Sequence, residues 1–89
     1  MALKSELGRI DLIRVGFHHR GKLEKNDVLG ARTAVRSYFQ SRQYQVTVAA
    51  EGTTLVVYGC SRRPGPADWE GIAAVLAKDG YQARIRHGA

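Results

Sequence analysis

The sequence has one cysteine and no long apolar run, and both absences exclude classes of protein. Cys60 has no second cysteine with which to form an internal disulfide or a zinc-finger spacing, which favours a reducing compartment. No segment approaches the roughly 18 consecutive apolar residues that a membrane-spanning helix needs. Residues 1–10 contain no apolar region typical of a secretory signal. We therefore expect a cytoplasmic protein with no membrane span.

Acidic residues are also scarce, since 8 Asp and Glu stand against 14 Lys and Arg, for a formal net charge of +6. Such a basic chain is typical of nucleic-acid binders, and it also suits an acidic protein partner. A base-composition bias of the genome that favours arginine would produce the same excess of basic residues. No residues have the spacing of a metal site or of a catalytic nucleophile with its base. We expect no metal, no cofactor and no enzymatic activity.

Six segments with strand or helix patterns follow one another along the chain. Apolar residues alternate as in strands over residues 10–17, 44–50, 55–58 and 81–86, and recur at helical spacing over residues 26–42 and 66–79. Pro66 suits the first turn of the second helix, and Gly80 suits its C-terminal end. The order β-α-β-β-α-β predicts an α+β ferredoxin-like two-layer sandwich. Its antiparallel sheet has the order 4-1-3-2, with two helices on one face.

The two halves of the chain repeat one plan. A Tyr-Gln pair begins the strand after each helix, at Tyr44 and at Tyr81. At 89 residues the chain has room for one small core, so pairing with a second copy would add stability, and we consider a homodimer. The expected organisation is a short N-terminal arm of residues 1–9 and one domain of residues 10–88, with a pseudo-repeat of residues 10–50 and 53–87.

The two helices cover one face of the sheet, and strand alternation assigns residues to the other, open face. An apolar interaction face is expected at its centre, from residues of the first and third strands: Leu12, Leu55 and Val57. A basic side is expected from the first and fourth strands: Arg14, Arg84 and Arg86. In this register the aromatic residues Phe17 and Tyr58 fall on the helix-covered side.

Two loops are rich in basic residues. One follows the first strand and contains His18, Arg20 and Lys22, and the other precedes the second helix and contains Arg62 and Arg63. Backbone N–H groups at a helix start attract anions, so phosphate contact is one hypothesis for these side chains, and simple solvation is the other. An antiparallel sheet places the two loops at opposite ends of the domain.

Together these patterns favour a small, basic, non-enzymatic binding module. The leading hypothesis is contact with RNA or DNA through the arginines of the open face and the basic loops. The alternative is a protein-interaction module, either a homodimeric regulator or a small inhibitor or adaptor of an acidic protein. Sheet-face RNA binders stack bases on aromatic residues of the central strands, and the expected register provides none, so binding would be mainly electrostatic.

The second half of the chain resembles the sporulation-related repeat domain. The likeness covers Leu55 to Ile85, chiefly the VVYG segment of residues 56–59 and the AKDGYQARI segment of residues 77–85. That family has the same duplicated β-α-β layout and binds peptidoglycan. The resemblance therefore implies peptidoglycan binding as a more distant alternative, and it implies no site residues for this chain.

Overall fold

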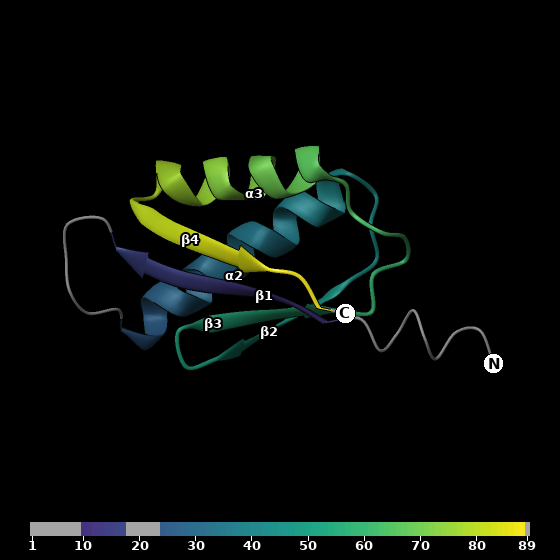
Figure 1. The fold of residues 1–89 in the computed structure, drawn as a ribbon. Coiled ribbons are helices and arrows are strands. Elements are labelled where there is room, and N and C mark those ends of the chain that lie inside the picture. Colours follow the sequence, from purple (N-terminus) through teal and green to yellow (C-terminus); the bar gives the residue numbers. More distant parts are fainter. Residues whose placement is uncertain (1–9, 18–23, 89) are drawn as a thin grey trace.

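The computed structural model describes residues 10–17 and 24–88, which form a four-stranded sheet and two helices (Figure 1). In chain order the elements are β1 (Ile10–Phe17), α2 (Lys25–Ser41), β2 (Thr47–Glu51), β3 (Thr54–Tyr58), α3 (Pro66–Lys78) and β4 (Tyr81–Arg86). The strands lie in the order β2-β3-β1-β4, and all neighbours are antiparallel. The predicted ferredoxin-like sandwich is therefore confirmed. Within the described residues, no helix has the length and apolar content to cross a membrane.

The central position of β1 sets the two faces of the sheet. Ile13 lies directly opposite Leu55 on β3 and Ile85 on β4. Ile13 and Leu55 are fully buried, and Ile85 packs against the same core. Because successive side chains of a strand point to opposite faces, this row faces the helices, and the residues between its members form the open face.

Both helices lie on one side of the sheet, where α2 packs mainly against β2 and α3 against β4 (Figure 1). Each presents a buried apolar stripe: Val28, Ala31, Val35 and Phe39 on α2, and Trp69, Ile72 and Leu76 on α3. The ring of Phe39 joins the layers, since it meets the rings of Tyr44 at 5.3 Å and of Trp69 at 6.0 Å, both edge-on. These residues recur at the helical spacing from which the two helices were predicted.

The ends of two elements differ from their predicted places. Helix α2 begins at Lys25, one residue earlier than predicted, with Glu24 as its N-cap, and Asp27 in its first turn accepts a hydrogen bond of 2.9 Å from the Glu24 N–H. Strand β2 begins at Thr47, three residues later than predicted, because Tyr44 packs into the core beside Phe39 before the strand starts. Gly80 ends α3 as predicted, with a left-handed φ of 87°.

The predicted register of β3 is wrong by one residue. Leu55 and Val57 were expected on the open face, but both are fully buried on the helix side. Val56 instead lies opposite Leu12 on β1, and the two residues share the open face. The run from Leu55 to Tyr58 is apolar or aromatic throughout, so its alternation could not indicate which residues face the core.

Other expected features lie outside the described residues. They are the N-terminal arm of residues 1–9 and the basic loop residues His18, Arg20 and Lys22.

The other basic loop, which contains Arg62 and Arg63, is described. It follows β3 at the end of the sheet where Tyr58 pairs with Ile10.

The two helices approach each other closely where Gly71 of α3 faces Tyr38 of α2. A Cβ atom at Gly71 would lie 2.8 Å from both Cε2 and Cζ of the Tyr38 ring. The Tyr38 hydroxyl donates a hydrogen bond of 3.3 Å to Oδ1 of Asp68, one turn earlier on α3. The absence of a side chain at Gly71 therefore lets the ring reach its acceptor.

We predict that substitutions at Gly71 and Tyr38 are not additive. In a Tyr38→Ala background, Gly71→Ala should raise the free energy of unfolding by about 1 kcal/mol, because alanine has the higher helix propensity. With Tyr38 present the added methyl group displaces the ring, and this gain should be lost. A double-mutant cycle by urea denaturation should therefore show a coupling of about 1 kcal/mol. Additive effects would contradict the close contact.

Candidate functional site

The open face consists of rows of residues that lie opposite one another on neighbouring strands. Each row is given in the strand order β2, β3, β1, β4. The row nearest the β2–β3 hairpin contains Glu51, Thr54, Arg14 and Arg84. The next row contains Ala49, Val56, Leu12 and Arg86, and the row at the other end of the sheet contains Thr47, Tyr58 and Ile10. The face is therefore apolar over the central strands and basic over β4 and the adjoining part of β1.

The arginines of this face are close together, and none has an acidic partner in the part of the chain that the structure describes. Arg14 and Arg84 are a direct cross-strand pair, and Arg86 follows on the same face of β4. All three are exposed, and within residues 10–17 and 24–88 none makes a salt bridge or a side-chain hydrogen bond. Glu51 lies in the row of Arg14 but two strands away, about 10 Å at the usual strand spacing. Like charges directly opposite each other destabilise a sheet, so this arrangement favours a bound anion.

The three arginines surround a shallow depression of about 270 Å³ in the sheet surface. Its lining residues are Leu12, Arg14, Thr54, Arg84, Ile85 and Arg86. Guanidinium groups are planar, permanently charged donors that can bind a phosphate through two parallel hydrogen bonds. The depression thus combines an apolar floor with a basic rim, and Leu12 and the arginines lie on the face predicted for them.

The apolar part of the face includes residues that sequence reasoning missed. Ile10 is 45% exposed and Tyr58 is 38% exposed, and the two lie directly opposite each other on the central strands. Tyr58 was expected on the helix side, and the one-residue shift of β3 brings it to the open face. The register of Leu12 with Val56 is what reveals it, and only the pairing of β1 with β3 determines that register.

Arg62 and Arg63 do not join the arginines of the open face. The Arg62 guanidinium lies 4.0 Å from the centre of the Tyr44 ring, on the helix side of the sheet, and donates a 2.9 Å hydrogen bond to the Arg42 carbonyl oxygen. Arg63 is exposed in the same loop. The structure therefore separates these two candidate residues from Arg14, Arg84 and Arg86.

The start of α3, expected to attract anions, already has a carboxylate beside it. Asp68 accepts hydrogen bonds from the Tyr44 hydroxyl at 2.6 Å and from the Gly65 N–H at 3.1 Å through Oδ2, and from the Tyr38 hydroxyl through Oδ1. The bond from Tyr44, followed by those from Gly65 and Tyr38, lowers the pKa of Asp68. The same contact with Asp68 raises the pKa of Tyr44, and burial raises that of Tyr38. Asp68 thus places a negative charge at the start of α3, which disfavours binding of an external phosphate there.

A second polar group lies on the helix side of β1. Asp11 is only 2% exposed, and its Oδ1 accepts a hydrogen bond of 3.3 Å from the Gly88 N–H and lies 3.2 Å from Nδ1 of His87. The His87 ring lies 5.0 Å from the ring of Trp69. These contacts anchor the chain beyond β4. The signal in the sequence is that alternation puts Asp11 on the same side as Ile13, which makes it a polar residue on a buried face.

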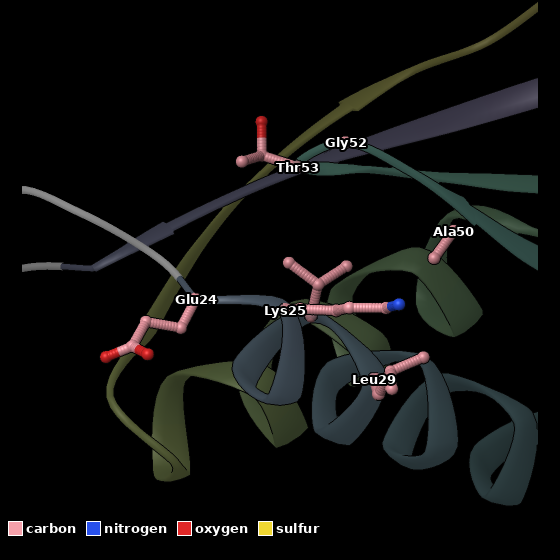
Figure 2. A pocket seen from close by; sticks show the side chains of 7 residues that line it. Glu24, Lys25, Leu29, Ala50, Gly52 and Thr53 are labelled. Atoms are coloured by element: carbon pink, nitrogen blue, oxygen red, sulfur yellow. The ribbon is translucent and has the colours of Figure 1, made fainter.

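A larger hollow of about 460 Å³ lies between the start of α2 and the β2–β3 hairpin (Figure 2). Its lining residues are Glu24, Lys25, Val28, Leu29, Ala50, Gly52 and Thr53. In Figure 2 the Lys25 side chain extends along the hollow, whereas Glu24 points away from it. This leaves one charged group facing an apolar surface, which gives no constellation for acid–base chemistry or anion binding.

No metal centre is found among the residues that the structure describes, since these contain no group of three or more His, Cys, Asp or Glu residues that could hold an ion. Cys60 is half-buried just beyond the end of β3 and packs against the core. This environment is that of a small apolar residue. The arginine-rich face therefore remains the strongest candidate site.

Because its folded-state pKa is lowered, Asp68 should make the stability of the fold depend on pH. Its stabilising contribution should be complete above the unfolded-state pKa of about 3.9 and be lost as the pH falls through the lower folded-state pKa. We therefore expect the difference in unfolding free energy between the natural chain and Asp68→Asn to shrink on acidification below about pH 4. Tyr44→Phe should weaken this dependence, because it removes the main hydrogen bond. Urea denaturation across this pH range measures the effect, and parallel curves would contradict it.

Comparisons of the chain with protein families, with curated proteins and with solved structures each found no match. The resemblance of the second half of the chain to the sporulation-related repeat domain is therefore unaccompanied by a family match. What the open face binds has to be inferred from its own residues.

Proposed function

We propose that this chain is a small non-enzymatic module that binds nucleic acid on the open face of its sheet. The observation that carries the proposal is the arrangement of Arg14, Arg84 and Arg86 around one depression, without an acidic partner in the described part of the chain. Such a cluster fits phosphates, because each guanidinium can donate two hydrogen bonds to one phosphate.

The charge of the whole chain supports the same ligand. A net charge of +6 on 89 residues attracts a polyanion more strongly than it attracts a single small anion. A bound phosphate backbone would also relieve the repulsion between Arg14 and Arg84. The sequence has a single cysteine, which suits a reducing compartment, and we propose that this binding takes place in the cytoplasm.

A second candidate is a protein-interaction module, and one observation favours it. The centre of the open face is apolar, because Ile10, Leu12, Val56 and Tyr58 lie on adjacent strands there. An acidic protein or a second copy of the chain would cover these residues. Arg14, Arg84 and Arg86 beside them favour a partner that brings negative charge, which a second copy with a net charge of +6 would not, and a nucleic acid brings a phosphate at every nucleotide.

Binding should depend on salt in a way that reports the three arginines. For a single-stranded oligonucleotide with three phosphate contacts, log K should fall with log salt with a slope of about 2, at roughly 0.7 per contact. Arg84→Ala/Arg86→Ala should weaken binding and reduce the slope to about 0.7. Fluorescence anisotropy of a labelled oligonucleotide, titrated at several salt concentrations, measures both quantities.

The matched control is Arg36→Ala/Lys78→Ala, which removes the same charge from exposed positions on α2 and α3. This variant should keep the slope of the natural chain. Equal losses in the two double variants would mean that net charge alone binds the oligonucleotide. Absence of binding together with a dimer mass in sedimentation would overturn the proposal in favour of the second candidate.

A further inference from the structure

Three of the four tyrosines make hydroxyl hydrogen bonds that link elements of the fold, and Tyr58 makes none among the described residues. The hydroxyl groups of Tyr38 and Tyr44 donate to Asp68, and that of Tyr81 donates to a backbone carbonyl of α2. Within residues 10–17 and 24–88, Tyr58 has no aromatic or cation–π contact and no hydroxyl hydrogen bond. Tyr58 is 38% exposed on the face that carries Arg14, Arg84 and Arg86.

The position of Tyr58 suits contact with a flat ligand. It is the last residue of β3, a central strand, and it lies between Thr47 on β2 and Ile10 on β1. Gly59 follows with a left-handed φ of 69°, which turns the chain out of the strand directly after the ring. Its cross-strand neighbours are small or aliphatic and carry no charge, and Tyr58 is 38% exposed, so it presents uncharged aromatic surface to solvent.

We propose that Tyr58 is a stacking platform for a base of single-stranded nucleic acid whose phosphates lie on Arg14, Arg84 and Arg86. This inference rests on the proposed function and deepens it, because it selects a single strand over a duplex. Bases of a duplex are stacked on one another and leave no free face along its length. An unpaired base can stack on an aromatic side chain, and this contact is tolerant of sequence.

The geometry of the sheet gives the direction of the bound strand. Tyr58 lies opposite Ile10, and Arg14 is four residues further along β1, about 13 Å at the rise of an extended strand. Between them lies the row in which Val56 and Leu12 form an apolar floor beside Arg86. The strand would therefore run across the sheet from the end of β3 towards the arginine pair, with bases over the central strands and phosphates on the side of β4.

The test compares three probes: a short oligothymidine, a duplex oligonucleotide and inorganic polyphosphate. Tyr58→Ala should weaken binding of the oligothymidine by roughly 5- to 150-fold and leave the affinity for the other two probes unchanged, because only the single strand offers a base for stacking. Tyr58→Phe should bind as the natural chain does. Tyr58→Leu should bind as the alanine variant does, and it keeps apolar bulk on β3 if the alanine variant fails to fold.

The outcomes separate this inference from the function on which it rests. Binding of all three probes with no effect of Tyr58→Leu would overturn the stacking role and leave polyanion binding intact. Binding of none would overturn the proposed function itself. A dimer that dissociates on substitution of Tyr58 would also overturn the inference, because the ring would then serve a protein interface.

Discussion

The pairing of β1 with a strand on each side is the constraint on which both faces of the sheet depend. Ile13 is held between Leu55 and Ile85, and these apolar side chains have to meet the helices because water excludes them. A shift of either neighbour by one residue would exchange its two faces. The same pairing therefore buries Leu55 and brings Arg84 opposite Arg14 on the open side.

In the helix layer, a single carboxylate connects three parts of the chain by hydrogen bonds. Asp68 links the N-terminal end of α3 to Tyr38 on α2 and to Tyr44 in the segment before β2. Tyr44 also provides the ring on which Arg62 lies. Through Arg62 the basic loop before α3 is attached to the rest of the fold. This arginine therefore packs on the protein itself, although the composition of the loop suggested anion binding.

The open face, by contrast, contains side chains that the described fold does not use. Within residues 10–17 and 24–88, Arg14, Arg84 and Arg86 make no salt bridge, and Tyr58 makes no aromatic contact and no hydroxyl hydrogen bond. Electrostatic attraction to phosphates is strong but reads no sequence, whereas stacking requires an unpaired base. The proposed ligand, a single strand, offers both kinds of group at once, because it has phosphates for the arginines and unpaired bases for Tyr58.

The sequence alone determined the order of the elements, because hydrophobic spacing and helix-ending residues are local properties. Pro66 and Gly80, for example, mark the two ends of one helix wherever that helix packs. It also placed Arg14, Arg84 and Arg86 on one face, since polar and apolar residues alternate clearly in β1 and β4. Only the tertiary structure decided which residues of β3 face the helices, because the run from Leu55 to Tyr58 contains no charged residue whose position would indicate the exposed face. Its partner strand and the helices above it settled that choice, and with it the exposure of Tyr58.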